Sequence, residues 1–78
     1  MAHAFVNVWL KSEILDPQGK AVSQALHRQG LTSVQEVRQG KRFRIDFSGQ
    51  ISKADLEKVA KEVLSNPVIE DFEIEIID

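Results

Sequence analysis

The side chains able to carry out covalent or acid–base chemistry are few in this 78-residue sequence, and they are widely spaced. Cysteine is absent, which excludes a thiol nucleophile and a thiolate metal site. None of the six serines lies in a G-x-S-x-G setting, and no phosphate-binding glycine motif is present. His3 is near the N-terminus, and His27 falls near a predicted helix end, where a protonated ring suits the helix dipole. These residues predict a protein without an active site of its own.

An acidic C-terminal segment is a weak candidate for metal binding, because Glu73 and Glu75 alternate with apolar residues and are expected to face solvent. The segment comprises Glu70, Asp71, Glu73, Glu75 and Asp78.

Charge is unevenly distributed along the chain: residues 1–45 carry +4, residues 46–78 carry −6, and the total is −2. This asymmetry favours oriented docking to a partner, although two solvated faces would explain it equally well.

The elements that must position these residues follow from hydrophobic periodicity. Residues 3–11, 34–39, 42–47 and 71–76 alternate or are apolar and predict strands, with a hairpin turn at Gly40-Lys41. Asp16-Pro17 predicts the start of a first helix that ends at Gly30. A second helix is expected from a Ser52 cap to a stop at Asn66-Pro67.

The resulting order, β-α-β-β-α-β, predicts an α+β ferredoxin-like sandwich in a single domain, residues 1–78. In this arrangement an antiparallel four-stranded sheet carries both helices on one face. A domain of this length has a small core, and without cysteine or a metal site it is expected to gain stability by self-association. No apolar run is long enough to span a membrane and no secretory signal is visible, so a cytoplasmic location is expected.

Two aromatic residues break the polar pattern expected on the uncovered face of the sheet. Phe5 and Trp9 share one face of the first strand with Asn7. Contiguous exposed apolar surface often marks an interface, so we expect this pair to contact another subunit. The alternative is that Arg or Lys side chains lie over the rings in a monomer.

Two other functional classes are compatible with this fold. An RNA-recognition domain would place aromatic residues outward on the third strand, but Phe43, Ile45 and Phe47 alternate as the core set there. Outward placement would bury Arg42, Arg44 and Asp46, and the net negative charge also disfavours nucleic acid. A ferredoxin-like regulatory domain that binds a small ligand is the second alternative, which calorimetry with amino acids or nucleotides would test.

Three blocks of sequence resemble the PurS family over essentially the whole chain. They are residues 10–26, which include Ile14-Leu15-Asp16-Pro17-Gln18-Gly19, then residues 34–41, and finally residues 64–72 with Asn66-Pro67. The resemblance implies the small subunit of phosphoribosylformylglycinamidine synthase, an enzyme of de novo purine synthesis. In that complex a PurL-type synthetase uses ATP and Mg, and a PurQ-type glutaminase releases ammonia from glutamine. The small subunit is implied to bridge them as a homodimer or higher oligomer, to support ammonia transfer, and to bind no cofactor itself.

Within these blocks, four residues are less demanded by the fold and are therefore the better candidates for partner contacts: Gln18, Arg38, Lys41 and Glu70. We expect charge reversal at Arg38 or Lys41 to weaken assembly while leaving the fold intact. Neither nucleic acid nor a membrane is expected as a partner.

Overall fold

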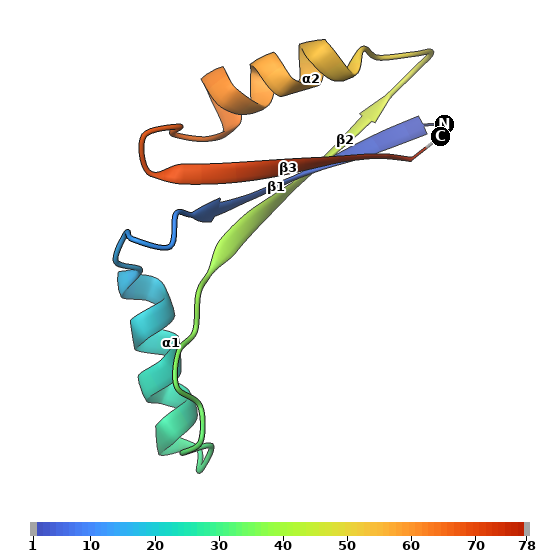
Figure 1. Ribbon diagram of the computed structural model, residues 1–78. Helices are drawn as coiled ribbons and strands as arrows, with labels where there is room; N and C mark the ends of the chain where they lie inside the picture. Colours follow the sequence, from blue (N-terminus) through green and yellow to red (C-terminus); the bar gives the residue numbers. More distant parts are fainter. Residues whose placement is uncertain (1, 78) are drawn as a thin grey trace.

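The computed structural model describes residues 2–77, so Met1 and Asp78, the two ends of the predicted domain, lie outside it. Its strands are β1 (Ala2–Leu10), β2 (Gly40–Phe47) and β3 (Glu70–Ile77). The helices are α1 (Pro17–Arg28) and α2 (Lys53–Val59), the latter extended by one π-helical turn, η1 (Ala60–Leu64). Figure 1 shows α2 lying along one face of the sheet, whereas α1 points away from it.

The sheet is antiparallel with the order β2-β1-β3, so the hydrophobic strand β1 is central. Val6 of β1 stands opposite Phe43 of β2 and Ile74 of β3. Directly opposed residues point to the same side of a sheet, so these three side chains share its covered face. The alternation predicted for the three strands that form is confirmed, and with it the inward placement of Phe43 and Ile45 that argued against base stacking.

The core lies between this face and the helix formed by α2 and η1. Val6, Val8 and Ala60 are fully buried at its centre, and Leu56 anchors α2 beside them. Around the centre pack five half-buried apolar residues: Phe43, Ile45, Leu64, Phe72 and Ile74. In the part of the chain that the structure describes, only five hydrophobic residues are buried, so this core is small even for a chain of this length.

The helix ends follow the sequence. Asp16 is the N-cap of α1, with Pro17 at its first position, and Gly30 adopts a positive φ of 96° just after its C-terminus. The Ser52 side chain caps α2 by accepting hydrogen bonds from Ala54 N and Asp55 N. At the other end, Ser65 Oγ donates to Ala60 O and closes the π turn. Local capping chemistry therefore predicted where both helices begin and end.

The predicted fourth strand does not form within the described chain, whose sheet has three strands. Within residues 2–77, the segment 34–39 pairs with no strand, and the hairpin at Gly40-Lys41 does not form. Instead the chain runs straight from residue 34 into β2, so α1 and the segment beside it project from the end of the sheet (Figure 1). The prediction that both helices cover one face is wrong for the same reason. We call residues 16–39, which comprise α1 and the extended segment antiparallel to it, the arm.

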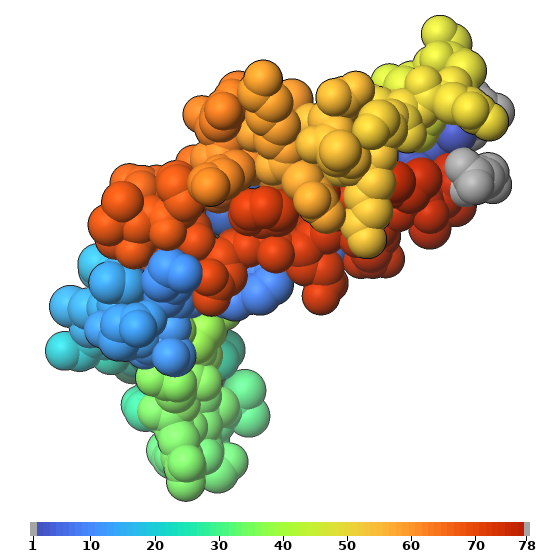
Figure 2. All heavy atoms as spheres, turned by 45° about the horizontal axis from the view of Figure 1, so that its top comes forward, coloured from blue at the N-terminus to red at the C-terminus, as the bar shows by residue number. Residues whose placement is uncertain are grey.

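This arrangement makes the chain unusually extended. The radius of gyration is 15.8 Å, and the dimensions are 48 × 28 × 14 Å. A compact domain of this length would have a radius of gyration of roughly 11–12 Å. Figure 2 shows the arm standing clear of the sheet and α2 in a space-filling view. None of the helices in the described residues is long and apolar enough to cross a membrane.

Candidate partner-binding site

The base of the arm brings together residues that are far apart in the sequence. Because both neighbours of β1 are antiparallel to it, β1 ends where β2 and β3 begin. Trp9 therefore stands opposite Gly40, and Leu10 stands opposite Glu70. The arm starts from the same corner at Asp16 and returns to it at Gln39. Four segments thus meet at one end of the sheet.

Asp16 joins the two halves of the arm. Its side chain is buried; one carboxylate oxygen accepts from Gly19 N at 2.8 Å, and the other from Gln39 N at 2.6 Å. The Gln39 N–H bond, then the Gly19 N–H bond, hold the pKa of Asp16 below its ordinary value. The sequence identified the cap but missed the second contact, since nothing near Asp16 indicates a partner 23 residues away.

The hydrogen bond from Gln39 N to the Asp16 carboxylate makes the free energy of unfolding depend on pH. The pKa of Asp16 is lowered in the folded state, so its stabilising effect is present above about pH 4 and is lost as pH falls through the folded pKa. We expect Asp16→Asn to lower the Tm at neutral pH by about 5 °C and to reduce the further loss below pH 4. Thermal unfolding monitored by circular dichroism across this range measures both effects.

The matched control for this prediction is Asp55→Asn, which removes an exposed carboxylate from the first turn of α2. If Asp16→Asn and Asp55→Asn shift the acid limb of the Tm profile equally, the Asp16 contacts do not carry the pH dependence.

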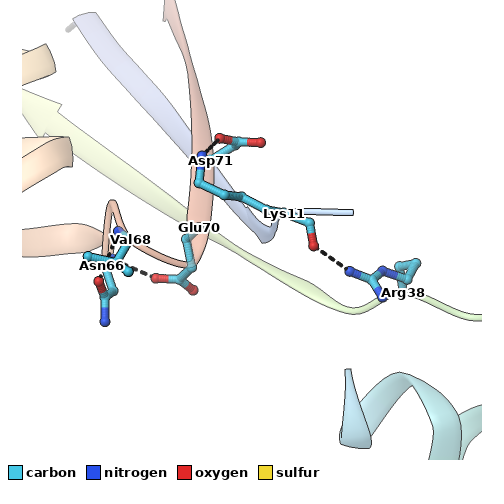
Figure 3. Close-up of polar contacts among 6 residues, drawn as sticks. All are labelled: Lys11, Arg38, Asn66, Val68, Glu70 and Asp71. Carbon is cyan, nitrogen blue, oxygen red and sulfur yellow. Dashed lines mark hydrogen bonds and ion pairs between the residues drawn. The ribbon is translucent and has the colours of Figure 1, made fainter. Parts of the chain in front are cut away.

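Arg38, Lys11 and Asp71 fix the arm to the strand ends, as Figure 3 shows. Arg38 Nη2 donates to Lys11 O at 2.9 Å, and Lys11 Nζ forms an ion pair of 2.6 Å with Asp71 Oδ1. The bond to Asp71 raises the pKa of Lys11. Within the arm, Gln39 Nε2 donates to Gln18 Oε1 at 2.6 Å. Arg38 and Gln18 therefore have structural contacts that the sequence did not predict.

Glu70 supports the turn that enters β3. Its Oε1 accepts from Asn66 N at 2.7 Å, and Asn66 Oδ1 in turn accepts from Val68 N at 3.1 Å (Figure 3). The other carboxylate oxygen lies 3.7 Å from Lys41 Nζ at the start of β2. Glu70 thus ties β2 to the turn across the end of β1.

Most of the predicted contact residues gather around one hollow. A cavity of about 440 Å³ opens between the arm and the sheet, and Trp9, Gln18, Lys41 and Glu70 line it. Arg38 lines an adjoining hollow of about 340 Å³, again beside Trp9. The structure therefore brings five of the six predicted residues to one corner, which the sequence alone did not indicate.

Phe5, the sixth residue, lies apart from this corner in the middle of the uncovered sheet face. The Arg42 guanidinium is 3.8 Å from the centroid of the Phe5 ring. The His3 ring packs edge-on against Phe5, with 5.2 Å between the two ring centroids. Phe5 is thus covered in the way that the monomer alternative expected. Trp9 is different, because 40% of its surface is exposed.

The corner is suited to recognition. It combines one exposed Trp, amide groups and charged side chains, the residue types that hydrogen-bond and pack against another protein. Across residues 2–77, no group of three His, Asp or Glu side chains converges to hold a metal ion.

Comparison with known proteins shows which family this chain belongs to. The family model described as PurS, phosphoribosylformylglycinamidine (FGAM) synthase, matches residues 3–78. The chain belongs to the PurS family. A curated PurS subunit of phosphoribosylformylglycinamidine synthase from Mycobacterium leprae is 47% identical over 74 residues, which cover 95% of this chain and 94% of that protein.

Solved PurS structures share the extended shape. The structure of Bacillus subtilis PurS superposes with a TM-score of 0.87 at 36% identity, over 100% of both chains. The structure named PurLQS from Thermotoga maritima contains a chain with a TM-score of 0.79 at 23% identity, over 99% of both chains. Because the match covers the arm as well as the sheet, a detached α1 is a feature of the PurS fold.

Proposed function

We propose that this PurS chain is the non-catalytic assembly subunit of phosphoribosylformylglycinamidine synthase in de novo purine synthesis. It bridges the PurL-type synthetase and the PurQ-type glutaminase and supports the transfer of ammonia between them. The name of the Thermotoga maritima complex, PurLQS, supports such an assembly. ATP, Mg and glutamine are substrates or cofactors of the other two subunits, and the complex works in the cytoplasm. The chain acts as a single domain.

The observation that carries this proposal is the incomplete fold. On the covered face of β2, Phe43, Ile45 and Phe47 are only partly buried, and α1 points away from the sheet (Figure 1). The arm in turn presents apolar surface to solvent, because Val22 and Leu31 are exposed, as is Leu15 just before the arm begins. A chain that leaves both surfaces open is built to be completed by another molecule.

The proposed function includes a homodimer, and the geometry suggests how the two copies meet. The straight chain from residue 34 through β2 replaces the predicted hairpin, so the pairing that the hairpin would make inside one chain becomes available between two. If two copies exchange arms, each segment 34–39 supplies the fourth strand of the other sheet, and each α1 covers the other β2. Both copies then reach the four-stranded arrangement that the sequence pattern predicts.

Reconstitution with purified subunits tests the proposal. We expect glutamine-dependent activity of the synthetase and glutaminase together to fall at least about tenfold when this chain is omitted. Activity with free ammonia should change much less, because ammonia does not need to be transferred between subunits. Equal glutamine-dependent activity with and without the chain would contradict an assembly role. Omitting the glutaminase is the control, since it removes only the glutamine-dependent reaction.

A further inference from the structure

The two sides of the helix formed by α2 and η1 differ in chemistry. Leu56 and Ala60 are buried and mark the middle of the stripe that packs on the sheet. At about 100° of rotation per residue, Val59 and Val63 fall on one side of this stripe, and both remain exposed, at 41% and 73%. The other side carries two exposed charged residues: Glu57 and Lys61. The charged side suits water, whereas the valine side has the composition of a packing surface that residues 2–77 leave uncovered.

The valine side faces β2. β2 and β3 both run antiparallel to β1, so they are parallel to each other, and α2 is the crossover that connects them. Crossovers of this kind are right-handed in nearly all proteins. With α2 and η1 lying over β1 and β3, this hand turns Val59 and Val63 toward β2. The opposite side of the helix then faces the outer edge of the sheet beyond β3, which accounts for its charges.

The two valines therefore border the part of the covered sheet face that α2 leaves open. Phe43, Ile45 and Phe47 of β2 are only partly buried there. Val59 and Val63 form one wall beside these three side chains, and the five together make an apolar surface that we call the β2 shelf. Contiguous apolar surface of this kind marks a docking site.

The helix α1 has a side that matches the β2 shelf. Within its own chain, α1 packs on the extended segment of the arm through Gly19 and Ser23, the two buried residues of this helix. Next to that buried face lie Val22, which is exposed, and Ala25 and Leu26, which are partly buried. The far side of the helix carries exposed polar residues: Lys20, Gln24 and Arg28. Like α2, α1 thus has one apolar side and one polar side next to its packed stripe.

A single cause leaves both surfaces open. Because Gly40 continues β2 instead of turning, α1 is carried away from β2, and the valine side of α2 loses the neighbour that the predicted β-α-β-β-α-β arrangement would give it. Each chain therefore contains the two halves of one contact and cannot join them itself. This complementarity within one sequence favours a second copy as the occupant of the β2 shelf.

The orientation of α1 in an exchanged pair also fits. Exchange reproduces the predicted arrangement, so α1 takes the place of the crossover from β1 to residues 34–39, and the right-handed rule applies to it as well. That hand turns Val22 toward α2 of the other copy and Lys20 toward solvent.

We propose that Val59 and Val63 of one copy form a helix–helix seam with Val22 of a second copy. Two-fold symmetry then gives the dimer two such seams. The inference rests on the homodimer in the proposed function and adds to it the residues through which the two copies meet.

The absence of cysteine makes the seam directly testable by crosslinking. One doubly substituted chain carries Val22→Cys with Val59→Cys, and another carries Val22→Cys with Val63→Cys. Each is prepared with and without isotope label, refolded as an equal mixture, and treated with a short bis-maleimide. We expect linked peptides that join residue 22 of one copy to residue 59 or 63 of the other, shown by mass spectrometry as pairs of mixed label. Val22→Cys with Lys61→Cys is the matched control and should give no such pair.

A second measurement uses the strength of the dimer. Val59→Gln with Val63→Gln removes two valines from each of two seams, so we expect the dimer dissociation constant to weaken at least about thirtyfold. Glu57→Gln with Lys61→Gln changes the opposite side of the same helix and should alter the constant less than about threefold. All four positions are exposed in the single chain, so each variant should fold, which circular dichroism checks. Sedimentation velocity over a dilution series gives the constants.

The outcomes separate the seam from the proposed function. A dimer whose residue 22 links to neither valine position of the other copy overturns the seam and leaves the homodimer intact. Pairs of uniform label alone would show that α1 folds back over its own β2, which also overturns it. If the glutamine variants keep the wild-type dimer but lose binding to the synthetase or the glutaminase, the β2 shelf is a partner contact and the seam is wrong. A wild type that is monomeric at every concentration overturns both the seam and the homodimer, whereas the reconstitution experiment tests the assembly role independently.

Discussion

Replacing Leu56 with alanine is expected to lower the free energy of unfolding by about 3 kcal/mol, enough to unfold much of the protein at room temperature when it is monomeric. Leu56 is 2% exposed and is the one buried residue of α2. Since the described residues bury only four other hydrophobic side chains, the loss of one large member cannot be absorbed by neighbouring packing. The cavity left behind adds to the lost transfer free energy.

Urea titration followed by circular dichroism measures this change. Glu57→Ala is the control, because Glu57 is the exposed neighbour of Leu56 on the same helix and the substitution removes no buried contact. An unfolding midpoint for Leu56→Ala equal to that of Glu57→Ala would show that α2 does not depend on this contact.

Replacing Gly19 with valine is expected to convert the proposed arm-exchanged dimer to monomer by changing the shape of the arm. A Cβ at Gly19 would overlap the Val37 carbonyl oxygen and lie 2.8 Å from Asp16 Oδ2. The backbone oxygen cannot rotate away as a side chain would, so α1 and the segment 34–39 must separate. The Asp16 bridge between Gly19 N and Gln39 N is then lost as well. An arm without its extended segment in place cannot supply a fourth strand to another copy.

Sedimentation velocity over a dilution series measures the result: we expect a dissociation constant at least about a hundredfold weaker than that of the wild type. Ala21→Val enlarges an exposed residue of the same helix and should leave the constant unchanged. A dimer that persists in Gly19→Val would count against arm exchange, and a wild type that is monomeric at every concentration would exclude self-association altogether.

The alternation of the strands and the ends of the helices were predictable because their causes are local. Asp16-Pro17, Gly30 and Ser52 act on backbone groups within a few residues of themselves, and a strand with one buried face must alternate. The inward position of Phe43 and Ile45 followed from the same rule. The candidate residues were also chosen locally, as positions that their own element does not need.

The fourth strand could not be settled in this way. A tight hairpin at Gly40-Lys41 requires positive φ, and among the described glycines only Gly30 and Gly49 adopt it. Gly40 instead continues β2, where its missing side chain lets it approach Val8 O closely. Gly40 was therefore predicted to form a turn, whereas in the structure its missing side chain allows two strands to approach closely. The sequence alone does not distinguish these two roles of glycine.

By itself, the sequence determined both helices, the three strands of the sheet with the face that each buries, and the absence of Cys and of a phosphate-loop motif, because these depend on residue type and short spacing. Only the tertiary structure decided that the chain stays open at Gly40, that Asp16 binds a residue 23 positions away, and that five candidate residues meet at one corner, namely Trp9, Gln18, Arg38, Lys41 and Glu70. The physical reason is that these features depend on which surfaces pack together. The same local pattern is satisfied whether the fourth strand returns to its own sheet or is left for another copy.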